Sequence, residues 1–249
     1  MSGHSKWHSI KHKKGANDKK RGKIFTKHAR LITISAKNGA DPSTNPALRA
    51  AIDSAKADNV PNENIDRAIK KGSGEGGQEI QMFEIMYEGY GPSGVAILIS
   101  VVTDNKNRSV SNVRTIMQKN GGNLGEAGSV SWMFEKKAYF VVDIENKNPE
   151  EAELEIIEMG VDDIKADQNI FEVFAAPDML FEVKTKLEAA KYKIEDSKLA
   201  MIPKNTVQIS DVETAQKIVN LIDKIDEDDD VFEIYANYDF DQAILDKLE

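Results

Sequence analysis

The residues most able to bind a ligand are concentrated at the start of the chain. The first thirty residues contain ten basic side chains and one acid, Asp18, so this segment carries about nine positive charges in a protein whose net charge is −9. Trp7, His8, His12 and Phe25 are interleaved with the basic residues. Lysines neutralise phosphates as point charges, and aromatic rings can stack on bases. The pattern therefore predicts contact with nucleic acid.

The predicted contact residues combine the basic side chains with the neighbouring aromatic and histidine rings. They are Lys6, Trp7, His8, Lys11, His12, Lys13, Lys14, Lys19, Lys20, Arg21, Lys23, Lys27 and Arg30. Lysines outnumber the arginines that usually read guanine, and the predicted helices lack a clear helix-turn-helix spacing. These residues favour contact with the phosphate backbone over base reading, and they slightly favour RNA.

A metal site is the first alternative for this segment. His4, His8 and His12 recur every four residues and would line one face of a helix, which is compatible with zinc or nickel ligation. However, the nearby sequence supplies lysines that would repel a divalent ion and no carboxylate. We therefore expect these histidines to contact phosphates or bases, and we expect no metal and no other cofactor.

An enzyme is the second alternative. The chain contains no cysteine, which excludes disulfides and a cysteine nucleophile, and all four histidines lie in the first thirty residues. The acidic remainder therefore lacks the usual pairings of nucleophile and base, although a site built from paired carboxylates remains open. We expect a non-enzymatic protein.

Two other loops resemble ligand sites only in part. Residues 226–230 begin like a calcium-binding loop, but Val231 replaces the glycine at the sixth place and Asn237 the glutamate at the twelfth. We interpret them as a solvated turn. Residues 72–77, GSGEGG, fit a glycine-rich phosphate-binding pattern but follow a predicted helix and precede a strand, which is the reverse of the required order. We interpret them as a linker.

Residues 103–108, TDNKNR, lie where a predicted strand leads into a helix N-terminus, and the glycines 121, 122, 125 and 128 follow that helix. A helix N-terminus favours anions. Helix capping and plain turns explain both runs, and the alternative is a contact surface for RNA or a protein.

The elements that must position the basic segment are helical. Capping residues, apolar spacings of three and four, and terminal glycines predict helices over residues 17–39, 45–59 and 62–72. Beyond the linker, the apolar period changes to two. The predicted order there is strands 82–87 and 95–102, helix 107–119, strand 129–134, strand 139–143, helix 149–159, strands 163–166 and 170–175, helix 177–190, strand 194–202, helix 211–225 and strand 231–236.

Residues 139–202 follow the order βαββαβ, which is typical of a ferredoxin-like unit. The helix and strand after Pro203 would complete the sheet that begins at residue 82. We therefore predict an α+β fold: an N-terminal three-helix domain followed by two α/β sandwich-type domains, one ferredoxin-like and inserted into the other. The predicted domains are residues 1–76 (basic arm plus helices), 78–135 with 205–249, and 136–204.

The longest apolar run, residues 95–102, is too short for a membrane span, which needs about 20 residues. No apolar stretch follows the basic N-terminus as it would in an export signal. We expect a cytoplasmic protein without a membrane partner.

Several long motifs resemble one known family. These are GHSKW, IKHKK, DKKRGKIFTKHAR, NPALRAAIDSAKADNVP, NIDRAIKKG, YEGYGPSGVA, TDNKNRS and GGNLGEAGSVSWMF, in this order. Together they resemble the YebC/PmpR family, which includes a mitochondrial translational activator of cytochrome oxidase subunit one. His8 departs from the small residue expected after the tryptophan.

The resemblance implies three domains and a cytoplasmic regulator that binds DNA and acts on transcription. The alternative that it implies is a ribosome-associated, RNA-binding translation factor. Both alternatives require a polyanionic partner, as the residues themselves do.

Overall fold

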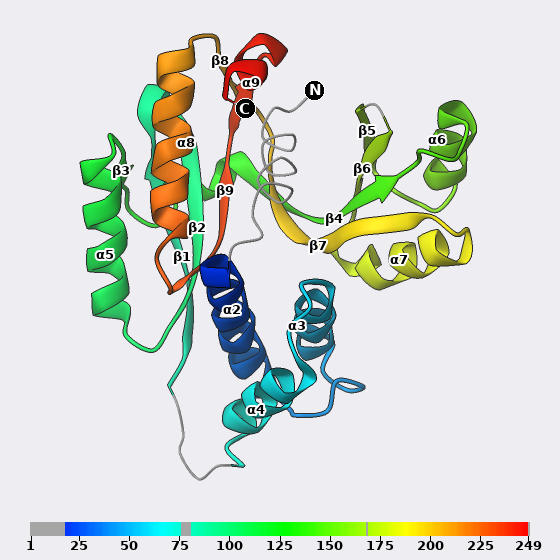
Figure 1. Ribbon diagram of the computed structural model, residues 1–249, viewed down its shortest axis with the longest axis horizontal. Coiled ribbons are helices and arrows are strands. Elements are labelled where there is room, and N and C mark those ends of the chain that lie inside the picture. Colours follow the sequence, from blue (N-terminus) through cyan, green and yellow to red (C-terminus); the bar gives the residue numbers. More distant parts are fainter. Residues whose placement is uncertain (1–17, 76–80, 168, 249) are drawn as a thin grey trace. The chain divides into compact units, whose positions relative to one another are not determined.

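The computed structural model describes residues 18–75, 81–167 and 169–248. Two compact units are present, and each is considered by itself. The inserted unit is Phe134–Lys204, and the main unit contains the described residues before and after it (Figure 1). The chain therefore leaves the main unit at Met133 and returns to it at Asn205.

The main unit begins with three helices, α2 (Asp18–Ala36), α3 (Pro46–Ala57) and α4 (Asn62–Ser73). The sequence explains their ends. Asn45 caps α3 by accepting a hydrogen bond from the Leu48 backbone N–H, and Pro46 occupies the first turn. Gly74, at φ 79°, ends α4 in the left-handed conformation that glycine favours. The helices enclose a core around Ile32, Leu48, Ala55 and Ile65.

The rest of the main unit is a sheet covered by helices. Its antiparallel strands are ordered β3-β1-β2-β9. The elements are β1 (Phe83–Tyr90), β2 (Ala96–Thr103), α5 (Lys106–Lys119), β3 (Asn123–Leu124), α8 (Val212–Asp226) and β9 (Val231–Ala236). A parallel pair, β8 (Val207–Ile209) with β10 (Tyr238–Phe240), and the terminal helix α9 (Gln242–Leu248) complete the unit.

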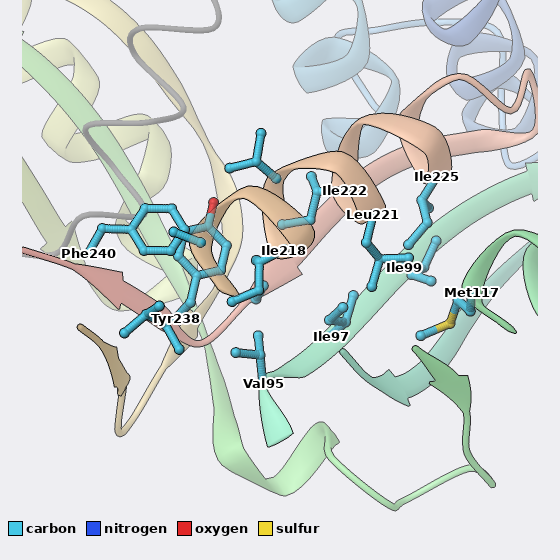
Figure 2. Close-up of a cluster of buried hydrophobic side chains, with 14 of the residues drawn as sticks. Val95, Ile97, Ile99, Met117, Ile218, Leu221, Ile222, Ile225, Tyr238 and Phe240 are labelled. Carbon is cyan, nitrogen blue, oxygen red and sulfur yellow. The ribbon is translucent and has the colours of Figure 1, made fainter. Parts of the chain in front are cut away.

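The core of this sheet lies between β2, α5 and α8 (Figure 2). Val95, Ile97 and Ile99 are fully buried on one face because alternate residues of a strand point the same way. Met117 of α5 and the apolar face of α8 pack against them. β2 is an interior strand, paired with β1 and β9, and it is buried along its whole length.

The inserted unit has the order βαββαβ. Its antiparallel sheet is ordered β5-β6-β4-β7, the strand order of a ferredoxin-like fold. The elements are β4 (Phe134–Asp143), α6 (Pro149–Ile157), β5 (Asp163–Asp167), β6 (Ile170–Ala175), α7 (Leu180–Ala189) and β7 (Lys193–Pro203). Phe140, Phe171 and Leu187 are among its buried side chains.

The predicted fold class is confirmed, whereas some elements differ from the prediction. The predicted strand at residues 129–134 is wrong: a 3-10 turn, Ser131–Met133, lies there, and the strand β4 begins only at Phe134. The short strands β3, β8 and β10 and the helix α9 were not predicted, because their sequences are too short to show a period. The three predicted domain boundaries stay a prediction.

None of the helices in the described ranges is long and apolar enough to cross a membrane.

Helix α4 ends at Ser73, one residue past its predicted end at Gly72, and Gly72 packs directly against α2. A Cβ atom at position 72 would lie 2.2 Å from the Thr33 backbone oxygen. We expect Gly72→Ala to destabilise the protein by about 1–3 kcal/mol through overpacking, measured by urea unfolding. Gly22→Ala is the matched control, because its Cβ atom would meet nothing within 4 Å. It should stabilise α2 by about 0.5–1 kcal/mol, and equal effects at the two sites would contradict the assignment.

Candidate nucleic-acid interface

The structure describes only part of the predicted contact set. Its first seven members, Lys6, Trp7, His8, Lys11, His12, Lys13 and Lys14, lie outside the described residues. Lys19, Lys20 and Arg21 lie in the first turns of α2. Among the described residues no cluster of three metal-ligating side chains is present, and the three histidines of the metal alternative lie outside them.

The remaining three contact residues bind the chain itself. Lys23, Lys27 and Arg30 are spaced by four and three residues, so they share one face of α2. This face meets the acidic turn, which we define as residues 226–230 between α8 and β9. The Lys23 Nζ donates a hydrogen bond of 2.7 Å to the Glu227 backbone oxygen. The Lys27 Nζ lies 2.8 Å from the Asp226 Oδ1, in an ion pair in which the lysine side chain is mostly buried.

Arg30 continues this contact into the interior of the main unit. Its Nη1 donates to the Asp229 backbone oxygen at 2.7 Å and pairs with the Asp230 carboxylate. Asp230 is only 5% exposed. The Arg108 Nη2 of α5, at 3.0 Å, and the Thr103 Oγ1 of β2, at 2.9 Å, donate to its other oxygen. Asp230 therefore joins α2, α5 and β2 at the start of β9.

The electrostatics of this junction favour an ionised carboxylate. Burial by itself would raise the pKa of Asp230, but the hydrogen bonds from Arg108, Thr103 and Arg30 outweigh it and hold the pKa below its ordinary value of 3.8. The interpretation of residues 226–230 as a solvated turn is therefore wrong for Asp230. Sequence reasoning missed it because five adjacent acidic residues look alike, and only their partners distinguish them.

The polar run at residues 103–108 belongs to the same junction. Asn105 caps α5 by accepting from the Arg108 backbone N–H at 3.0 Å, and Thr103 is fully buried. Helix capping thus accounts for this run. The negative charge beside the helix N-terminus is supplied by Asp230 of the same chain.

His28 is buried rather than displayed. Its Nε2 lies 2.5 Å from the Asp58 Oδ2 at the end of α3, and its ring forms a T-shaped contact with the Phe232 ring at a centroid distance of 6.2 Å. This histidine connects α2 to α3 and reaches β9. His28 therefore anchors α2 and is not available at the surface of the protein.

A second buried carboxylate organises the glycine-rich run that follows α5. Glu88 of β1 is 7% exposed and accepts hydrogen bonds from the backbone N–H groups of Gly128 (2.7 Å), Val130 (2.8 Å) and Ser131 (2.8 Å). Burial would raise the pKa of Glu88, but these donors outweigh it and lower the pKa. Because the backbone N–H groups of Val130 and Ser131 donate to a side chain, these residues do not form the predicted strand. No sequence pattern marks Glu88, since its partners are backbone groups.

Comparison with known proteins identifies the family. A family model described as the TACO1/YebC protein N-terminal domain matches residues 5–75, and one described as the TACO1/YebC second and third domain matches residues 82–238. The chain belongs to the TACO1/YebC family. The resemblance found in the sequence motifs is thus confirmed.

Relatives and a solved structure match nearly all of this chain. A "probable transcriptional regulatory protein" of Maridesulfovibrio salexigens is 50% identical over 251 residues and covers all of both chains. The probable transcriptional regulatory protein YrbC of Bacillus subtilis is 49% identical over 96% of this chain and 99% of its own. The crystal structure of a conserved hypothetical protein, Aq1575, from Aquifex aeolicus has a TM-score of 0.82 and 43% identity, covering 90% of this chain and 93% of that chain.

The contacts of Asp230 predict that its substitution strongly destabilises the main unit. We expect Asp230→Asn to destabilise the main unit by about 3–5 kcal/mol in urea unfolding, because it leaves Arg30 and Arg108 without their buried counter-charge. Asp104→Asn is the matched control: this carboxylate also pairs with Arg108 but is 58% exposed. Its loss should cost about 0–1 kcal/mol. Equal losses in the two variants would contradict the central role of Asp230.

The same carboxylate predicts a pH dependence. Because folding lowers the pKa of Asp230, its contribution is complete above the ordinary carboxyl pKa of 3.8 and is lost as the pH falls through the folded pKa. The difference in unfolding free energy between the parent and Asp230→Asn should therefore be constant near neutral pH and shrink as the pH falls below the ordinary carboxyl pKa of 3.8. Urea titrations across this range would measure it, and a difference that grows on acidification would contradict the assignment.

Proposed function

We propose that this protein is a non-enzymatic, cytoplasmic regulator that binds the phosphate backbone of DNA through its basic N-terminal arm. The observation that carries the proposal is the charge asymmetry: about nine positive charges in the first thirty residues and about eighteen negative charges in the rest. The names of the relatives, probable transcriptional regulatory proteins, support a regulatory role on DNA.

The contacts of α2 divide the predicted contact residues into two groups. Lys23, Lys27 and Arg30 are bound to the acidic turn, so we assign them to anchoring the helix. The residues that precede them are then the contact group: Lys6, Trp7, His8, Lys11, His12, Lys13, Lys14, Lys19, Lys20 and Arg21. The contact group thus includes the first turns of α2 and the residues before them, whereas the C-terminal part of α2 is packed in the helical core.

The acidic remainder of the chain restricts where a polyanion can bind. A negative surface repels phosphates. At physiological salt this repulsion acts over about 8 Å, the Debye length. The phosphates of the nucleic acid are therefore directed to the arm. This division explains how a protein with an isoelectric point near 5.1 can bind DNA.

Binding of RNA by a ribosome-associated translation factor is the alternative. The observation that favours it is the composition of the arm, where eight of the ten basic residues are lysines, since lysine contacts phosphates without reading bases. Affinities for duplex DNA and for ribosomal RNA in the same buffer separate the two: preference for RNA, with co-sedimentation with ribosomes, would replace DNA as the partner.

The proposal predicts that neutralising the arm weakens binding in a salt-dependent way. Replacing Lys11, Lys13 and Lys14 together by glutamine should weaken binding to duplex DNA and lower the slope of log K against log salt by about 0.9 for each phosphate that the variant no longer neutralises. Fluorescence anisotropy over a salt series measures both quantities.

The matched control removes the same charge elsewhere. Lys119, Lys136 and Lys191 are exposed, and changing all three to glutamine should leave the slope unchanged. If the two triple variants lose affinity equally, net charge and not the arm governs binding. If the intact protein binds neither DNA nor RNA at low salt, the proposed function is wrong.

A further inference from the structure

Two exposed aromatic residues of the main unit share one anchor. The Tyr90 Oη donates to the Ser129 backbone oxygen at 3.0 Å, and the Trp132 Nε1 donates to the same oxygen at 3.1 Å. Tyr90 is 36% exposed and Trp132 is 64% exposed. We refer to Tyr90 and Trp132 as the aromatic pair. It lies apart in sequence from the basic arm and uses none of its residues.

The anchor of the aromatic pair is held firmly. Glu88 accepts hydrogen bonds from the backbone on both sides of Ser129, at Gly128 and Val130, and its own backbone oxygen accepts from the Gly125 N–H at 2.8 Å. Tyr90 is fixed separately, because its backbone is paired with β2 and β3. A buried carboxylate and a sheet thus fix the Ser129 carbonyl before any ligand arrives, which reduces the entropy lost on binding.

The chemistry of the exposed rings favours a base over a protein. A Trp or Tyr at a protein interface commonly presents an apolar body together with an N–H or O–H that bonds the partner. Here both polar groups already donate to Ser129. What the exposed parts of the rings can offer is π surface, and stacking on π surface tolerates any base sequence.

We infer that the aromatic pair is a stacking site for an unpaired nucleobase of single-stranded nucleic acid. Bases within a duplex are already stacked on their neighbours, so the site selects single strands, loops or ends. The inference rests on the proposed function, because it adds a base-stacking contact to the phosphate contacts of the arm.

The test measures binding of a fluorescein-labelled oligouridylate and of a labelled RNA duplex of equal length by anisotropy. Trp132→Leu should weaken binding of the single strand by about tenfold, leave duplex binding unchanged and leave the salt slope unchanged, because stacking displaces no counterions. Trp132→Phe should retain most of the affinity, because it keeps a π face. Leu154→Ala, at a residue that is also 64% exposed, is the matched control and should have no effect.

The outcomes separate this inference from the proposed function. If the parent binds oligouridylate and Trp132→Leu binds it equally well, the stacking site is overturned, and a protein becomes the better occupant of the aromatic pair. A loss of affinity for the duplex as large as that for the single strand would also overturn it. If the parent binds duplex DNA but neither RNA probe at low salt, the stacking site is overturned. If it binds neither the RNA probes nor duplex DNA, the proposed function itself has failed. Urea unfolding of Trp132→Leu with parent-like stability would show that any weakening is not a folding defect.

Discussion

The arrangement of the main unit depends on the buried carboxylate of Asp230. An ionised group that is 5% exposed is stable only when partners replace its lost hydration. Those partners come from α2, α5 and β2, which are far apart in the sequence. The requirement that this one charge be satisfied therefore fixes where the basic helix α2 meets the sheet.

A consequence is that, under the proposed function, the positive charge in the N-terminal region has two uses. On one face of α2, Lys23, Lys27 and Arg30 are compensated by the acidic turn. Another part of the helix, with His28 and Ile32, is buried against its neighbours. The charge that precedes this anchored part is what a polyanion would meet.

Glu88 applies the same principle in a different way. Its charge is compensated by backbone N–H groups and not by cations, so it orders a glycine-rich segment instead of joining helices. The ordered segment displays Trp132, whereas a strand at the same place would have used its backbone groups in a ladder. In this acidic protein the buried carboxylates of Asp230 and Glu88 thus hold neighbouring segments in place, while most of the other carboxylates remain at the surface.

The sequence by itself determined the long elements, the α+β class, the family and the location of the positive charge. Helices such as α3 and strands such as β2 are encoded locally, by Asn45 and Pro46 at a helix start and by an apolar run of strand length. Only the tertiary structure decided which charges are compensated within the chain. Lys23 and Lys27 look like the other lysines of the arm, and the five acids of the acidic turn are equally alike, so no local pattern marks Asp230 for burial. The physical reason is that compensation of a charge depends on partners about 3 Å away in space and more than a hundred residues away in sequence, and such partners exist only after the chain has folded.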